Sequence, residues 1–185
     1  MRPMTRLKTS PRARLLALLA GFLLLATVYN AISTPFEAPD EIGHFYYTMY
    51  MLQHRRLPVV PATAPPPNYE HEGIQPPLYY ASAALFVRAL AAPLGLDLSA
   101  EALGAPLDKN PHTVCGRAGA SHNVAYLAHD PHEMRFPYAG RVRVLHVVRL
   151  WSSLLATATI AGIFATARAI FPQRLEIAWL AAVLT

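Results

Sequence analysis

The sequence has a single cysteine, no acidic residue before position 37 and none of the common motifs of soluble enzymes. Cys115 has no partner within the chain, so a scaffold held by internal disulfides is excluded. There is no Gly-rich phosphate loop, nucleophile elbow or paired-cysteine metal motif, so soluble nucleotide chemistry has no support. The net charge is +5, but no basic and aromatic motif accompanies it, so we do not expect a nucleic-acid partner.

The charges that are present are segregated along the chain. Five basic residues and no acid lie within residues 1–14. Nearly all the acids lie between Glu37 and Glu133, and every histidine lies between His44 and His146. Because basic segments stay on the cytoplasmic side of a membrane, this pattern is a topology signal. It predicts a cytoplasmic N-terminus and an acid-rich segment outside.

Long apolar runs flank that acid-rich segment. Residues 15–32 carry no charge and as a helix would span about 27 Å, close to the thickness of the hydrocarbon layer. Residues 142–170 form a second apolar run. Small residues repeat in it at a spacing of four, which lets membrane helices approach closely and predicts helical neighbours. The two repeats are Ala158, Gly162 and Thr166, and Ala161, Ala165 and Ala169.

These segments predict an all-α integral membrane protein of the plasma membrane, with two transmembrane helices and the start of a third. The predicted divisions are a cytoplasmic tail (1–14), a first transmembrane helix (15–32), a large extracytoplasmic loop (33–141), a second transmembrane helix (142–170), a cytoplasmic turn (171–174) and the start of a third helix (175–185). Because the third helix is too short to cross, we expect an N-terminal fragment of a multi-pass protein whose further helices are missing. Alternatively, the first apolar run is a cleaved signal peptide.

A short helix is predicted at about residues 41–54 of the loop. Apolar residues recur there at helical spacing, and tyrosines suit the headgroup level of a membrane. We therefore expect this helix to lie along the outer membrane surface. The apolar positions are Ile42, Phe45 (or Tyr46), Met49 and Leu52, and the tyrosines are Tyr46, Tyr47 and Tyr50.

A second short helix is predicted at about residues 78–92. Arg88 lies near the middle of the apolar stretch 78–96, where an arginine costs about 2.5–3.5 kcal/mol on membrane insertion scales. Pro93 and Gly95 should then break the helix. We predict a helix that lies at the surface or packs on the membrane domain. The alternative, a membrane span, would invert the topology of everything that follows.

Asp40, Glu41 and His44 form the first group of residues that could carry chemistry. If Asp40 opens a helix, His44 lies one turn away on the same face, and Glu41 is also within its reach. Such a group could hold a base oriented by a neighbour, or a divalent cation. The structural alternative, which local spacing favours, makes Asp40 an N-cap and Glu41 a first-turn acid.

The remaining polar groups are weaker candidates. We interpret Glu70, His71 and Glu72 as solvated, and Tyr79 and Tyr80 as interface anchors. Arg149 lies near the outer mouth of the second span, where it either binds a phosphate or carboxylate or snorkels to the interface. Several histidines have ligand-like spacing but match no strong zinc pattern, so a zinc-binding external loop is kept only as a minor alternative. These are His112-x-x-Cys115, His122 and His129-x-x-His132.

Three stretches, taken in order, resemble GT-C fold membrane glycosyltransferases, in particular the family 39 group of protein mannosyltransferases and aminoarabinose transferases, and related bacterial membrane proteins. Pro39-Asp40-Glu41-x-x-His44 resembles their first external loop. Gln75-Pro76-Pro77-Leu78-Tyr79-Tyr80 resembles their Pro-Pro-Leu-Tyr stretch, and Arg149-Leu150-Trp151-Ser152 resembles the start of their next span. The resemblance covers most of the chain from Pro35 onward.

The resemblance implies hexosyl or pentosyl transfer from a polyprenyl-phosphate donor to an acceptor hydroxyl on the outer face. Asp40 matches the expected base, and Glu41 would support it or bind acceptor. The expected substrate-binding residues are His44, Gln75, Tyr79 and Arg149. Gln75 departs from the lysine of aminoarabinose transferases, which removes a cation for the donor phosphate. The alternative is a non-catalytic small membrane protein whose external loop binds or scaffolds a partner.

Overall fold

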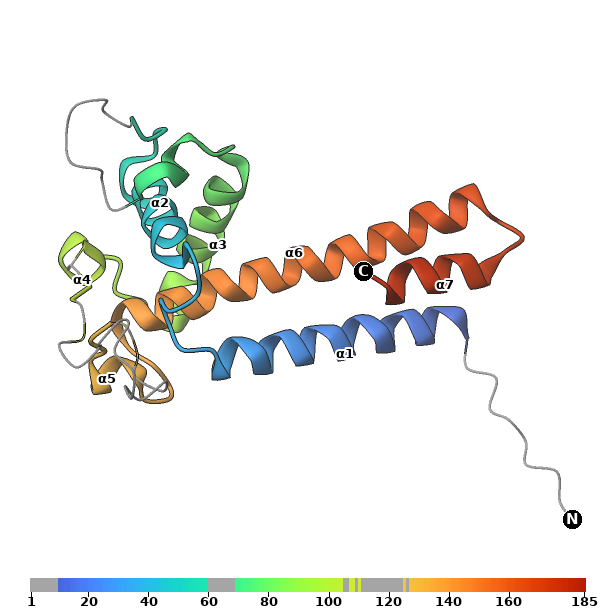
Figure 1. Cartoon of the computed structure of the whole chain (residues 1–185), viewed down its shortest axis with the longest axis horizontal. Helices are drawn as coiled ribbons and strands as arrows, with labels where there is room; N and C mark the ends of the chain where they lie inside the picture. Colours follow the sequence, from blue (N-terminus) through green and yellow to red (C-terminus); the bar gives the residue numbers. More distant parts are fainter. Residues whose placement is uncertain (1–9, 60–68, 105–106, 109, 111–124, 126) are drawn as a thin grey trace, which may run out of the picture. The chain divides into compact units, whose positions relative to one another are not determined.

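The computed structural model describes residues 10–59, 69–104, 107–108, 110, 125 and 127–185 (Figure 1). Throughout these residues the regular structure is helical, which confirms the all-α prediction. The helices are α1 (Pro11–Ile32), α2 (Glu41–His54), the 3₁₀ helix η1 (Glu70–Ile74), α3 (Leu78–Leu94), α4 (Ala100–Gly104), α5 (Pro131–Met134), α6 (Gly140–Ile170) and α7 (Leu175–Val183).

Two helices, α1 and α6, are long and apolar enough to cross a membrane. α1 begins four residues before the predicted start, because the Ser10 hydroxyl accepts a hydrogen bond from the Ala13 amide at 3.2 Å and Pro11 suits the first helical position. α6 begins two residues early, where Glu133 accepts a hydrogen bond from the Arg141 amide at 3.3 Å. Polar caps thus extend both helices beyond the apolar runs that predicted them.

The chain divides into two compact units, residues 1–30 with 152–185 and residues 31–151. In the first unit, Ile160 and Phe164 of α6 pack with Ala178 and Ala182 of α7. Partly buried α1 residues join this cluster, namely Leu15, Leu18, Leu19 and Phe22. The stripe of Ala158, Gly162 and Thr166 is exposed, so the helical neighbour expected there stays a prediction.

In the second unit, α2 packs against α3 and η1, and residues from the first part of α6 complete the core. The predicted apolar stripe of α2 is confirmed, since Phe45, Met49 and Leu52 are buried. The interpretation of Tyr46 and Tyr47 as headgroup anchors is wrong. They are 7% and 1% exposed, and the Tyr47 ring stacks on Tyr80 with 3.8 Å between centroids. These rings fill a protein core rather than a membrane interface.

α3 extends two residues beyond its predicted end. Pro93 lies inside the last turn and does not break the helix. The helix stops where Gly95 adopts a left-handed conformation (φ 59°), which glycine reaches without a steric penalty. Ala83 and Val87 are fully buried while Arg88 is exposed, so one face of α3 packs on protein.

Candidate functional site

Glu41 and Arg149 form an ion pair that ties the start of α2 to α6. Arg149 Nε lies 2.7 Å from Glu41 Oε1, and Nη2 lies 2.8 Å from Oε2. The same guanidinium donates to the Ser33 and Thr34 carbonyls at 2.9 and 3.2 Å. Glu41 Oε2 also accepts from the Phe36 amide at 2.7 Å. The pair therefore fixes the segment before α2, and the predicted substrate roles of Glu41 and Arg149 stay predictions.

Asp40 precedes α2 and is exposed. Its backbone is left-handed (φ 59°, ψ 0°) and its side chain makes no capping hydrogen bond. Asp40 is the N-cap residue by position and Glu41 lies in the first turn, as the structural alternative predicted. The expected side-chain cap is absent, because a capping side chain reaches the helix amides from an extended backbone. Among the residues that the structure describes, no hydrogen bond or ion pair engages this carboxylate.

His44 and Gln75, both predicted to bind substrate, are joined through the hydroxyl of Tyr80. Tyr80 donates to Gln75 Oε1 at 2.7 Å and lies 2.8 Å from His44 Nδ1. A hydroxyl carries one hydrogen, so His44 Nδ1 must be the donor in the second bond. In the neutral imidazole, Nε2 then holds the lone pair. Tyr79 lies edge-on to Tyr80, with 5.2 Å between ring centroids.

Glu72 is 1% exposed, so the interpretation of this residue as solvated is wrong. Its carboxylate lies against the backbone of Gly43 in the first turn of α2. Burial, together with the nearby charge of Glu72, raises the pKa of Tyr80 to about 12, which keeps Tyr80 a neutral donor. The interpretation of Tyr80 as an interface anchor is also wrong, since the residue is 2% exposed. Sequence reasoning therefore assigned neither Glu72 nor Tyr80 to the site. The available signal was Gly43 itself, since a glycine inside a helix often marks a close approach.

A second contact joins the two ends of the predicted loop. Glu37 Oε1 lies 3.0 Å from His129 Nε2 and accepts from the Leu127 amide at 2.9 Å. The described part of the chain holds no group of three or more His, Cys, Asp or Glu side chains that could bind a metal ion, so Asp40, Glu41 and His44 do not form one. His112, Cys115 and His122 lie outside the described residues.

Gly43→Ala is expected to destabilise the second unit by about 1–3 kcal/mol, the usual cost of overpacking. A Cβ at this position would lie 2.6 Å from Cδ of Glu72, whose side chain is buried and has little room to retreat. Thermal unfolding in detergent measures the effect. Gly162→Ala is the matched control, since nothing lies within 4 Å of its Cβ position. Equal midpoints for the two variants would contradict the close approach of Glu72.

Tyr80→Phe is expected to lower stability below pH 10 by about 1–3 kcal/mol, because His44 Nδ1 and Gln75 Oε1 lose their shared partner. The folded-state pKa of about 12 lies above the ordinary tyrosine pKa of 10.0. The contribution of Tyr80 is therefore complete below pH 10 and is lost as the pH rises toward 12. Denaturation of wild type and Tyr80→Phe across this range should show the difference shrinking. A constant difference would show that the hydroxyl is not held neutral.

Comparison with protein-family models, curated proteins and solved structures finds no match to this chain. The residues of the site are therefore the basis for assigning its function.

Proposed function

We propose that this chain supplies the acceptor-activating loop of a membrane glycosyltransferase. In this proposal α1 and α6 cross the plasma membrane with the N-terminus in the cytoplasm, and residues 33–141 lie on the outer face. Asp40 accepts the proton of an acceptor hydroxyl as its oxygen attacks the anomeric carbon of a polyprenyl-phosphate sugar. The new glycosidic bond forms as the bond from the anomeric carbon to phosphate oxygen breaks, and polyprenyl phosphate leaves.

The observation that carries this proposal is the different state of neighbouring carboxylates. Glu37 is held by His129 and the Leu127 amide, and Glu41 is held by Arg149. Asp40 is exposed and makes neither kind of contact with the described residues. It also comes eight residues after the end of a helix long enough to span a bilayer. A general base needs an accessible, ionised oxygen near the substrate, which here is a lipid-linked sugar at the membrane surface.

The polar network beside Asp40 supports an acceptor-binding role. His44 lies one helical turn from Asp40, and its Nδ1 is fixed by Tyr80, which is in turn held by Gln75. In its neutral form His44 can therefore accept, at Nε2, a hydrogen bond from a hydroxyl group of the acceptor. In the proposal, His44, Gln75 and Tyr79 orient the acceptor while Asp40 removes the proton.

The pairing of Glu41 with Arg149 favours a positioning role for both residues. The guanidinium binds the Ser33 and Thr34 carbonyls as well as Glu41, so it fixes the segment that carries Asp40. We propose that this pair holds Asp40 in place, rather than binding the departing phosphate. At least four of the five guanidinium N–H groups are used in these contacts.

A second candidate is a non-catalytic binding or scaffolding loop. It is favoured by three carboxylates of the loop that are engaged by other side chains of the protein, as Glu37 with His129, Glu41 with Arg149 and Glu133 with Arg141. The test that separates the two is sugar transfer from polyprenyl-phosphate donor by membranes containing the protein as its gene encodes it, with Asp40 intact or replaced. Transfer that depends on Asp40 supports the enzyme, and absence of such transfer supports the scaffold.

A further inference from the structure

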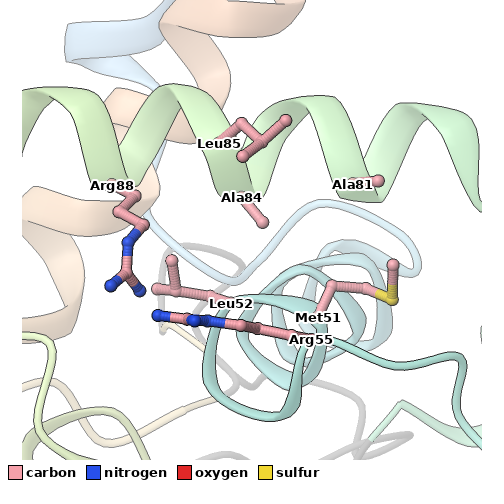
Figure 2. Close-up of a pocket in the computed structure, with 7 residues that line it drawn as sticks. All are labelled: Met51, Leu52, Arg55, Ala81, Ala84, Leu85 and Arg88. Carbon is pink, nitrogen blue, oxygen red and sulfur yellow. The ribbon is translucent and has the colours of Figure 1, made fainter.

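A groove lies between the C-terminal half of α2 and the middle of α3 (Figure 2). Its volume is about 470 Å³. Five of the residues that line it offer carbon or sulfur atoms to its walls, and two are arginines. The apolar set is Met51, Leu52, Ala81, Ala84 and Leu85, and the arginines are Arg55 and Arg88. Within the described part of the chain no carboxylate lines the groove, which therefore combines an apolar surface with positive charge.

The two arginines come from different helices and converge. Arg55 is the left-handed C-cap of α2, and Arg88 lies on α3. Figure 2 shows both guanidinium groups toward one end of the groove, with Met51 and Ala81 toward the other. Neither guanidinium hydrogen-bonds or pairs with any residue in the described ranges.

Three other arginines of the same unit, Arg56, Arg141 and Arg143, are engaged by the protein. Arg56 Nε donates to the Tyr50 hydroxyl at 3.1 Å, and Arg143 donates to the Leu94 carbonyl at 3.1 Å. Arg141 pairs with Glu133 at 3.3 Å. Arg55 and Arg88 differ from these three arginines, because within the described residues their charges face an open groove and meet no internal acceptor.

This combination matches the chemistry of an anionic lipid. A phosphate accepts parallel hydrogen bonds from a guanidinium group. The planar fork of arginine matches the phosphate geometry better than the single ammonium group of lysine does. An acyl chain would cover apolar wall that is otherwise open to solvent, such as Leu85, which is 69% exposed. A free phosphate would use the two arginines but leave the apolar wall uncovered.

We propose that this groove binds an anionic phospholipid of the surrounding bilayer. The phosphate lies between Arg55 and Arg88, and an acyl chain follows Met51, Ala81 and Leu85. The site is at the opposite end of α2 from Asp40, about 21 Å along a helix of 14 residues. The inference rests on the proposed membrane location and not on sugar transfer. It gives Arg88, an arginine in an apolar helix, a counter-ion at the membrane surface.

Lipid binding to the purified protein in neutral detergent tests this inference. Phosphatidylglycerol and phosphatidylcholine are titrated separately, and bound lipid is counted by native mass spectrometry. We expect phosphatidylglycerol to bind about tenfold more tightly. The double variant Arg55→Gln/Arg88→Gln should lose about tenfold in affinity for phosphatidylglycerol. Each basic residue near an anionic surface raises the affinity by roughly fivefold at most, so two of them can account for a loss of this size. Ala81→Leu, which narrows the groove, should also weaken binding.

Arg56→Gln is the matched control, because it removes an adjacent cation that already contacts Tyr50, and it should change affinity less than twofold. Equal binding of the two lipids, or an equal loss in Arg56→Gln, would overturn the proposal. Displacement of the lipid by glycerol phosphate at the same concentration would also overturn it, in favour of a free-phosphate site. No sugar donor is present, so failure here leaves the Asp40 test unaffected.

Discussion

Asp40→Asn is expected to lower sugar transfer by about 10²–10⁴-fold, the range in which a general base contributes. The amide keeps the size of the side chain but has little affinity for a proton, so the acceptor hydroxyl would have to attack without help. Because Asp40 is exposed and makes no side-chain cap, the change should leave folding intact. Transfer of labelled sugar from polyprenyl-phosphate donor in isolated membranes, normalised to the amount of inserted protein, measures the effect.

Glu101→Gln is the matched control, since Glu101 is another exposed acid of the same unit, in the first turn of α4. It should keep wild-type transfer within about twofold, because it removes one surface charge and no base. Asp40→Glu should restore part of the activity. Full transfer by Asp40→Asn, with normal insertion, would refute the catalytic assignment and leave the binding-loop alternative.

The helices of this protein were predictable because their signals are local. Long apolar runs marked α1 and α6, and apolar residues at helical spacing marked α2. The errors at helix ends came from polar caps such as Ser10 and Glu133, whose contacts extend a helix beyond its apolar run. Pro93 did not end α3 as predicted, because a proline in the last turn interrupts little helix after it.

The candidate site was predictable only in part, because its contacts join residues far apart in the sequence. Asp40 and His44 are neighbours through helical spacing alone. His44 meets Tyr80 across 36 positions, Glu37 meets His129 across 92, and Glu41 meets Arg149 across 108. No local pattern encodes such pairs. Burial of Glu72 likewise depends on η1 packing against α2, which the polar sequence of residues 70–74 did not indicate.

Arg149→Gln is expected to destabilise the second unit more than Gly43→Ala or Tyr80→Phe does. It leaves the Glu41 carboxylate unpaired at 15% exposure and removes the donors of two backbone carbonyls. Breaking a largely buried pair from one side costs about 3 kcal/mol or more. In a chain of this size that corresponds to a fall of roughly 6–12 °C in the unfolding midpoint, measured by thermal unfolding in detergent.

Arg143→Gln is the control, because within the described residues the guanidinium of Arg143 donates to the Leu94 carbonyl alone, at 3.1 Å. Its midpoint should fall by no more than about 3–4 °C, the equivalent of one hydrogen bond. The unfolding midpoint of the double variant Glu41→Gln/Arg149→Gln should fall by less than the sum of the falls in the two single variants. With both side chains neutral, no unpaired charge is left in the folded protein. Additive losses would mean that the two side chains do not interact.

The same variants distinguish positioning from direct contact with the donor phosphate. If the pair only holds the segment before α2, Glu41→Gln and Arg149→Gln break the same contact and should reduce transfer to similar extents. If Arg149 instead contacts the departing phosphate, Arg149→Gln should reduce sugar transfer much more than Glu41→Gln does, since Glu41 has no such role. Arg149→Lys keeps the charge but loses the two-pronged contact with Glu41, so under the positioning role it should behave like Arg149→Gln.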